Sequence, residues 1–283
     1  MPFSSKISIT KQIVFSNLWI SFGAVCLTLN FYVLNNITIN TSLLYFVFFT
    51  TLFSYNFQRL IKIKLNINLK GERVEWIMVN QKSVLLITSI ALLGSVYFGF
   101  EFILEFWAHL TFIGVLTFFY VWKIPGLNGK SLRDIPTLKI FIIAFVWVLF
   151  CVIFPYLVEN RYLFTQRVII DIISTFMLMV SITIPFDVRD MKLDKHTTKT
   201  IPQIIGETKA RYLSIILFLL SEALIVYNYP NLMYSSFIFI VVSVIILNLS
   251  KQTNKEIYFS GLVDSILVIK TLIILLFKFV TFL

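Results

Sequence analysis

Three carboxylates in the second half of the chain have a spacing that suits the binding of a metal ion. Asp187, Asp190 and Asp194 stand at positions i, i+3 and i+7, so on a helix they share one face. They follow a long apolar stretch, which places the predicted acidic face where a membrane helix emerges into water. Like charges at this spacing repel one another unless a cation lies among them, and Mg²⁺ prefers such hard oxygen ligands. The alternative is a solvated helix end whose carboxylates pair with basic neighbours such as Arg189 and Lys192.

The composition identifies lipid as the solvent of this chain. Of its 283 residues, 58% are hydrophobic and 13% are charged, and the mean hydropathy is +0.89. A soluble domain carries about 25% charged residues, so this chain has too little charge to cover a soluble surface of its size. The two cysteines, Cys26 and Cys151, both lie in apolar stretches, which excludes a secreted disulfide scaffold.

The apolar stretches predict an all-α, multi-pass transmembrane helical bundle that forms a single domain over residues 1–283. A membrane-spanning helix needs about 20 mostly apolar residues, and about nine stretches qualify. The third and fourth are close enough to form one kinked element, although two helices are favoured. The predicted spans are 13–34, 41–61, 83–100, 104–122, 138–158, 168–187, 211–228, 232–250 and 260–281.

The basic residues predict the orientation of these spans. With nine spans and the N-terminus inside, most of the 24 Lys and Arg residues fall in inside segments, whereas the outside loops hold only Arg161 and Arg167. By the positive-inside rule we expect the N-terminus inside and the C-terminus outside, in the inner (cytoplasmic) cell membrane. Basic flanks near anionic headgroups also account for the high pI without any nucleic acid partner.

Two inside segments are much longer than a tight connection between helices. Residues 62–82 follow the second predicted span, and residues 188–210 follow the sixth. The outside loops are short and almost uncharged. Because binding and catalytic residues concentrate on long loops, we expect the functional site at the inside face.

The residues after the sixth span resemble a known family. The segment Asp187-x-x-Asp190-x-x-x-Asp194 is followed by Lys199-Thr200-Ile201-Pro202, and then by Gly206 and Ala210. This order is similar to the second Asp motif, and the tail after it, of the UbiA superfamily of intramembrane prenyltransferases. The segment from Tyr120 to Lys139 also resembles the Tyr/Lys signature of that family, although Lys123 is one residue closer to the tyrosine than in the family pattern.

The resemblance implies a function and a set of site residues. It implies an integral membrane enzyme that transfers a prenyl group from a polyprenyl diphosphate, held by Mg²⁺, to an acceptor that the sequence does not identify. Asp187, Asp190 and Asp194 would bind the metal, with Asp190 and Asp194 also catalytic. The residues implied in diphosphate binding are Asn56, Arg59, Tyr120, Lys123, Lys130, Arg133 and Lys199. The implied partners are the diphosphate and membrane lipid, and no protein partner is indicated.

The chain departs from the family at the first Asp motif, which is expected at the inner end of the second span as Asn-x-x-x-Asp-x-x-x-Asp. Asn56 matches the leading asparagine, but Leu60 and Lys64 occupy the aspartate positions. In one interpretation, Arg59, Lys62 and Lys64 contact the diphosphate directly, and a single metal remains on the second motif. In the other, the scaffold has lost catalysis and binds a lipid or a protein. A transporter is disfavoured because no internal repeat is visible.

Three ionisable residues lie inside predicted spans, where charge is costly. Glu222 lies in the seventh span, and Asp264 and Lys270 lie in the ninth. We expect these residues to pair across helices, with contact to an aqueous cavity as the alternative.

Overall fold

The computed structural model describes residues 8–65, 71–124, 126, 129–135, 137–191 and 199–282, and these residues form helices joined by short connections, with no strand among them. Side chains are described as far as residue 278. The elements are α1 (Ile9–Phe15), α2 (Leu18–Asn35), α3 (Thr41–Lys64), α4 (Glu72–Val79), α5 (Gln81–Glu105), α6 (Trp107–Val121), the 3₁₀ turn η1 (Leu132–Asp134), α7 (Leu138–Val148), the π-helical η2 (Leu149–Ile153), α8 (Phe154–Val158), α9 (Gln166–Asp190), α10 (Ile201–Ile205), α11 (Glu207–Asn228), η3 (Pro230–Leu232), α12 (Met233–Asn248), the π-helical η4 (Tyr258–Val263) and α13 (Ser265–Phe282).

The prediction of an all-helical, multi-pass membrane fold is confirmed. Each of the nine predicted spans coincides with helix, and seven helical stretches are long and apolar enough to cross a membrane. The other two predicted spans correspond to α3, whose second half is polar and basic, and to α6, which has only 15 residues. The third and fourth predicted spans are two helices, α5 and α6, separated at Phe106. The number of spans and their orientation stay predictions.

The first predicted span is not a single helix. Asn17 adopts a left-handed conformation, with φ of 65°, and separates α1 from α2. Its side-chain amide donates to Oδ1 of Asn56 at 2.9 Å, and the Asn56 amide donates to the backbone carbonyls of Ser16 and Leu52. Asparagine tolerates this backbone conformation better than most residues, so the break is held in place by a buried amide network.

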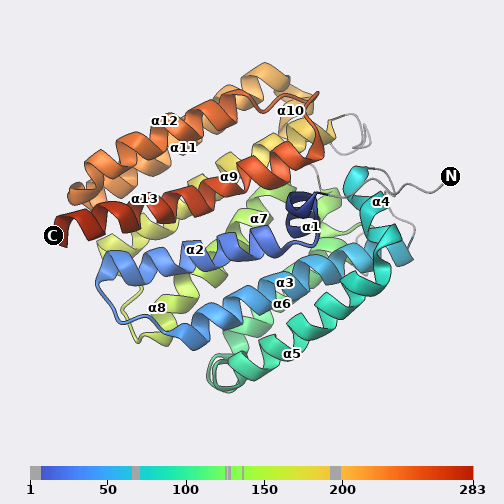
Figure 1. Ribbon diagram of the computed structural model, residues 1–283, viewed down its shortest axis with the longest axis horizontal. Coiled ribbons are helices and arrows are strands. Elements are labelled where there is room, and N and C mark those ends of the chain that lie inside the picture. Colours follow the sequence, from blue (N-terminus) through green and yellow to red (C-terminus); the bar gives the residue numbers. More distant parts are fainter. Residues whose placement is uncertain are drawn as a thin grey trace.

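Three short helices, α1, α4 and α10, lie at one end of the bundle (Figure 1). Figure 1 shows α1, α4 and α10 at the end opposite to the one where α13 finishes. The two long segments predicted to lie inside contribute α4 and α10, so both reach the same end of the molecule. This arrangement brings the basic end of α3, the end of α9 and the beginning of α7 together.

Helix α5 approaches α3 closely because it carries glycine at the contact points. A Cβ atom added to Gly99 would lie 2.3 Å from the ring of Phe46, and one added to Gly94 would lie 2.6 Å from the ring of Phe49. Phe46 is buried and meets the rings of Phe150 and Phe154 edge to face. Aromatic contacts of this kind therefore connect α3 to the α7–α8 segment in the core.

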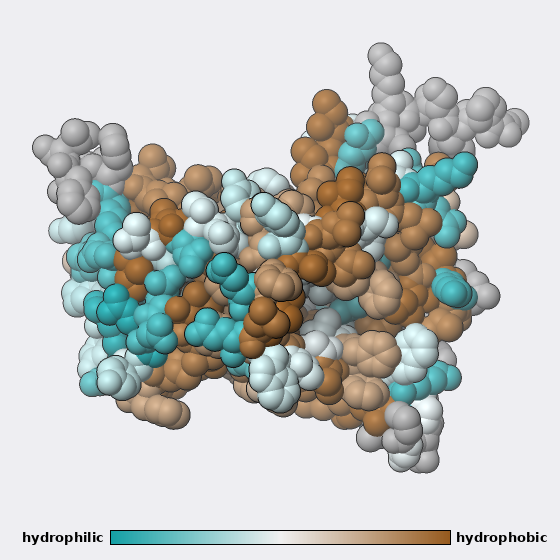
Figure 2. All heavy atoms as spheres, turned by 90° about the horizontal axis from the view of Figure 1, so that it is seen from below, coloured by the Kyte–Doolittle hydropathy of each residue, from teal (hydrophilic) through white to brown (hydrophobic). Residues whose placement is uncertain are grey.

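The outer surface carries the apolar side chains that lipid contact requires. Helix α5 exposes Leu86, Leu93, Phe100 and Leu104, each more than 60% accessible. Figure 2, which views the molecule from the α5 side, shows hydrophobic residues over much of this face and hydrophilic residues gathered toward the left end, where α13 finishes in Figure 1. Large exposed apolar surfaces mark contact with a membrane or another protein.

Candidate diphosphate-binding cavity

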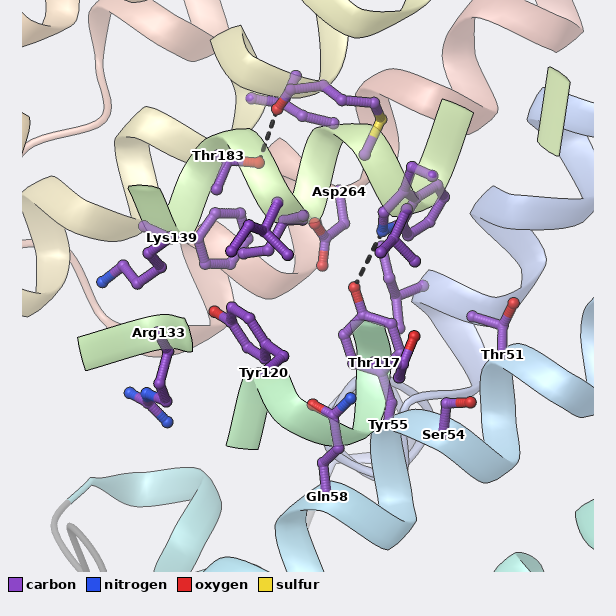
Figure 3. Close-up of a pocket in the computed structure, with 18 of the residues that line it drawn as sticks. Thr51, Ser54, Tyr55, Gln58, Thr117, Tyr120, Arg133, Lys139, Thr183 and Asp264 are labelled. Atoms are coloured by element: carbon purple, nitrogen blue, oxygen red, sulfur yellow. Dashed lines mark hydrogen bonds between the residues drawn. The ribbon is translucent and has the colours of Figure 1, made fainter. Parts of the chain in front are cut away.

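A cavity of about 280 Å³ opens among the helices α3, α6, α7 and α9, with contributions from α2, α4, η1, η2 and the residue after η4. One end is polar, lined by the basic part of α3, by η1, by the start of α7 and by the end of α9. The other end is apolar, lined by residues such as Ile113, Ile143, Trp147, Phe150 and Ile182. Figure 3 shows Arg133 and Lys139 on one side of the cavity, with the side chains of α3 and α6 reaching in from below. The cavity therefore joins a charged mouth to an apolar interior.

Helix α3 presents a different face to the cavity from the one predicted. Residues Ser54, Gln58 and Lys62, spaced i, i+4 and i+8, line the cavity. Asn56 lies away from it, completely buried in the amide network with Asn17. The helix face that carries Asn56, Leu60 and Lys64 therefore does not line the cavity. The observed set is one polar residue, one amide and one cation, so α3 contributes no carboxylate to the mouth.

The carboxylates at the end of α9 reach the cavity and are already paired with cations. Asp187 is buried, and its Oδ1 atom lies 2.6 Å from Nζ of Lys139 on α7. Arg189 donates from Nε to Oδ1 of Asp190 at 2.7 Å and from Nη2 to Oδ2 of Asp190 at 3.0 Å. Asp194, the third member of the predicted metal site, lies outside the described residues. The solvated-helix alternative foresaw pairing with Arg189, whereas Lys139 comes from a distant part of the chain.

Three cations at the mouth have no carboxylate partner among the described residues. Arg59 and Lys62 come from α3, and Arg133 comes from η1. All three are partly buried, and no described carboxylate lies within ion-pair distance of them. Lys62 also lies within electrostatic range of three cations, Arg59, Arg133 and Lys139, and of one carboxylate, Asp190. Positive charge is therefore concentrated at the mouth, where an anion would be attracted.

Arg73 lines the candidate site, although the sequence did not mark it. It lies on the short helix α4, 5% exposed, and lines the cavity. Its guanidinium donates to the carbonyl of Val14 and lies 3.6 Å from Glu256, which also approaches Arg189 at 3.7 Å. Burial lowers the pKa of Arg73 to about 10, which leaves it charged at neutral pH. No periodic pattern in segment 62–82 marks this residue, so only the fold reveals it.

The remaining predicted diphosphate ligands divide into two groups. Tyr120 lines the cavity, as do Arg59 and Arg133. Lys123, Lys130 and Lys199 are exposed, and none of them lines the cavity. The structure thus brings three of the seven predicted ligands together, and the role of the others stays a prediction.

The middle of the cavity carries groups that can exchange protons. Figure 3 shows the Asp264 carboxylate pointing between Tyr55 and Tyr120. Asp264 follows the π-helical segment η4 and is 9% exposed. The Trp147 indole donates to the Tyr55 hydroxyl at 3.3 Å, which leaves the phenolic proton available to a ligand. Asp264, expected to pair across helices, thus lies in the cavity instead, and π-helical turns are frequent at functional sites.

The described carboxylates at the mouth do not form a Mg²⁺ site. Mg²⁺ needs carboxylate or other oxygen ligands in near-octahedral geometry. No group of three or more His, Cys, Asp or Glu residues that could hold a metal occurs in the described part of the chain. The two carboxylates of α9 at the mouth are each bound by a cation. The described donor set therefore does not fit Mg²⁺ by itself.

Fold and cavity together define a polytopic helical membrane protein with a cavity that is cationic at one end and apolar at the other. Comparison with solved structures identifies the same fold in UbiA prenyltransferase homologues. A UbiA homologue from Archaeoglobus fulgidus bound to GPP and Mg²⁺ matches with a TM-score of 0.59 and 13% identity, over 95% of this chain and 97% of that one. A structure from work on digeranylgeranylglyceryl phosphate synthase matches with a TM-score of 0.53 and 15% identity, over 95% and 98%.

The chain therefore has the UbiA-type fold, as the motif resemblance implied. The ligand-free structure of the Archaeoglobus fulgidus homologue matches with a TM-score of 0.54 and 13% identity, over 95% of this chain and 97% of that one. No protein-family model matches the sequence, and comparison with curated proteins yields no match. At this level of identity the likeness concerns the fold.

Proposed function

We propose that this chain is an integral membrane prenyltransferase that binds a polyprenyl diphosphate in the cavity and transfers its prenyl group to an acceptor. The observation that carries this proposal is the junction of a cationic mouth with an apolar interior, within a fold that it shares with prenyltransferase homologues. Such a cavity matches the two halves of a prenyl diphosphate. The basic segments around the mouth favour a cytoplasmic-face site in the inner cell membrane.

The transfer reaction places clear demands on these residues. The allylic C–O bond breaks, and its electron pair leaves with the diphosphate. The acceptor nucleophile forms the new bond to the prenyl carbon and releases a proton. Cations at the mouth stabilise the charge of the leaving group as it develops. Apolar walls such as Ile143 and Phe150 hold the prenyl chain and exclude water from the reactive carbon.

Two arginines and a tyrosine have roles in this scheme. Arg59 and Arg133 suit diphosphate binding because a guanidinium makes two parallel hydrogen bonds to phosphate oxygens. Tyr120 adds a hydroxyl near the same end. Roles for Asp190 and Asp194 in catalysis, and for Mg²⁺ on the second Asp motif, stay predictions.

Donor titration tests the proposal. Purified protein in detergent is titrated with geranylgeranyl diphosphate, and the wild type is compared with Arg59→Gln. We expect saturable binding to the wild type and an affinity at least about tenfold weaker in the variant, because one charge-assisted contact contributes about 1.5–3 kcal/mol. Absence of binding to the folded wild type under every condition would contradict the proposal.

A second candidate is a protein that binds a prenyl lipid without transferring it. The observation that favours it is the cavity face of α3, where Ser54, Gln58 and Lys62 supply no carboxylate. Pyrophosphate release separates the two functions. Release from bound donor on adding a panel of hydroxylated aromatic and glycerol-lipid acceptors supports transfer, whereas donor binding without release across the panel supports the lipid-binding function.

A further inference from the structure

We infer that side-chain cations, and not Mg²⁺, hold the diphosphate in this cavity. This inference rests on the proposed function, because it concerns how the donor of that reaction is bound. The UbiA homologue with which this chain shares its fold holds GPP together with Mg²⁺. The donor set that the described residues of this chain provide differs in three respects.

First, the carboxylates at the mouth are already neutralised. The Asp187 carboxylate is in contact with Lys139, and both oxygens of Asp190 accept hydrogen bonds from Arg189. A metal ion that used these oxygens would have to displace two cations. Each displaced cation would then lie beside the metal in a partly buried site, where like charges interact strongly.

Second, α3 contributes a cation where a metal site needs an anion. The residues that line the cavity at i, i+4 and i+8 are Ser54, Gln58 and Lys62. A lysine ammonium has three donors and no acceptor, so Lys62 cannot be a metal ligand. Its charge lowers the affinity of the mouth for a divalent cation and raises the affinity for a polyanion.

Third, three cations at the mouth have no ion-pair partner among the described residues and can bind an anionic ligand. Of the described residues, six with cationic side chains and three with carboxylates line the cavity. Lys139, Arg189 and Arg73 have carboxylate partners in Asp187, Asp190 and Glu256. Among the described residues, Arg59, Lys62 and Arg133 have none. Partly buried cations without partners are costly, and a diphosphate would relieve their mutual repulsion.

These three observations lead to a single arrangement. Two arginines supply planar forks for phosphate oxygens, and Lys62 supplies a compact point charge. The pairs Lys139–Asp187 and Arg189–Asp190 then form the wall that positions them. In this arrangement Asp187 and Asp190 orient basic residues and do not coordinate a metal.

The experiment measures the affinity for geranylgeranyl diphosphate in detergent with EDTA and with Mg²⁺. We expect binding in EDTA with an affinity within about threefold of that in Mg²⁺. Arg59→Gln, Lys62→Gln and Arg133→Gln should each weaken binding in EDTA by about tenfold or more. The matched control is Lys209→Gln, an exposed lysine of α11 outside the cavity, which should bind like the wild type. Gel filtration and thermal unfolding establish that each variant is folded.

A gain-of-function variant provides an independent test. Gln58→Asp combined with Lys62→Asp places two carboxylates at i and i+4 on the cavity face of α3. We expect this double variant to lose binding in EDTA and to regain it when Mg²⁺ is added.

The outcomes separate this inference from the proposed function. Donor binding to the wild type that requires Mg²⁺, and that is lost in Asp187→Asn, would overturn the inference and uphold the proposed function. Donor binding in EDTA that depends on Arg59, Lys62 and Arg133 supports both. Absence of donor binding to folded wild type in EDTA and in Mg²⁺ overturns both.

Discussion

Two groups of charged side chains lie inside the helical bundle, and their surroundings differ completely. Glu222 on α11 and Lys270 on α13 form a pair at 2.7 Å, with side chains only 1% and 7% exposed. Lys270 also lies over the ring of Phe239. At the mouth of the cavity, Arg59 and Lys62 are partly buried and lack a carboxylate partner among the described residues.

The difference shows how to separate structural charge from functional charge in a membrane protein. A pair such as Glu222–Lys270 satisfies itself and needs no ligand, as the sequence analysis expected for these two residues. Cations without partners remain costly until an anion binds. The cations Arg59 and Lys62 line the cavity, whereas the pair Glu222–Lys270 does not.

The largest effect is expected when the buried pair is broken. Lys270→Met leaves the Glu222 carboxylate buried and unpaired, which should reduce the free energy of unfolding by about 3–5 kcal/mol. Glu222→Leu combined with Lys270→Met should recover most of this loss, since no charge then remains. Both are measured by denaturant or SDS titration in mixed micelles. A double variant as unstable as the single one would show that the pair is not the source of the stability.

A smaller loss is expected when a paired cation of the cavity wall is removed. Arg189→Gln takes away the two hydrogen bonds to Asp190 and the contact with Glu256. Because Arg189 is partly exposed to the cavity, the expected cost is about 2 kcal/mol. The same titration measures it, with Lys209→Gln as the control. A loss of stability as large as that of Lys270→Met would mean that the Arg189–Asp190 pair is as strongly shielded from solvent as the Glu222–Lys270 pair.

Removal of an unpaired cation should affect binding and stability in opposite directions. Arg59→Gln should weaken donor binding while it leaves the free energy of unfolding unchanged or raises it by up to about 1 kcal/mol, because a partly desolvated charge has been removed. Thermal unfolding of the ligand-free protein, followed by donor titration, tests both parts. Marked destabilisation of the ligand-free variant would place Arg59 with the structural charges.

The smallest change in stability is expected at Asp264. Its carboxylate lines the cavity without a hydrogen bond to the described residues. Asp264→Asn keeps the shape of the side chain, so the free energy of unfolding should change by less than about 1 kcal/mol. The denaturant titration used for Lys270→Met measures this change. A loss near 3 kcal/mol would indicate a buried ion pair instead of a cavity-facing carboxylate.

The sequence predicted the positions of the helices along the chain better than the rotation of each helix about its own axis. The predicted spans coincide with helix, and Asp187 and Asp190, whose metal role stays a prediction, line the cavity. The cavity face of α3 was predicted two residues out of register. A shift of two residues turns a helix by about 200°, so Asn56 and Ser54 point to nearly opposite sides. Both registers have i, i+4 and i+8 spacing, and the sequence provides no means of choosing between them.

The pairing of charges was also beyond the reach of pattern reasoning. Lys139 finds Asp187 across the bundle, and Arg73 reaches the cavity from a short helix between spans. Their partners are separated from them by long stretches of chain. A charge with a partner and a charge without one look alike in sequence, because each is a basic residue near the inner end of a span.

The sequence by itself determined that lipid is the solvent, that the backbone is helical and where polar residues collect along the chain. These properties follow from local sums of hydropathy and from the need to satisfy backbone hydrogen bonds in a membrane. Only the tertiary structure decided which face of each helix meets the cavity and which charges are neutralised. Those outcomes depend on helix rotation and on contacts between distant residues. The interaction of two charges falls with their distance, so a separation larger by a few ångströms leaves a cation free to bind a ligand.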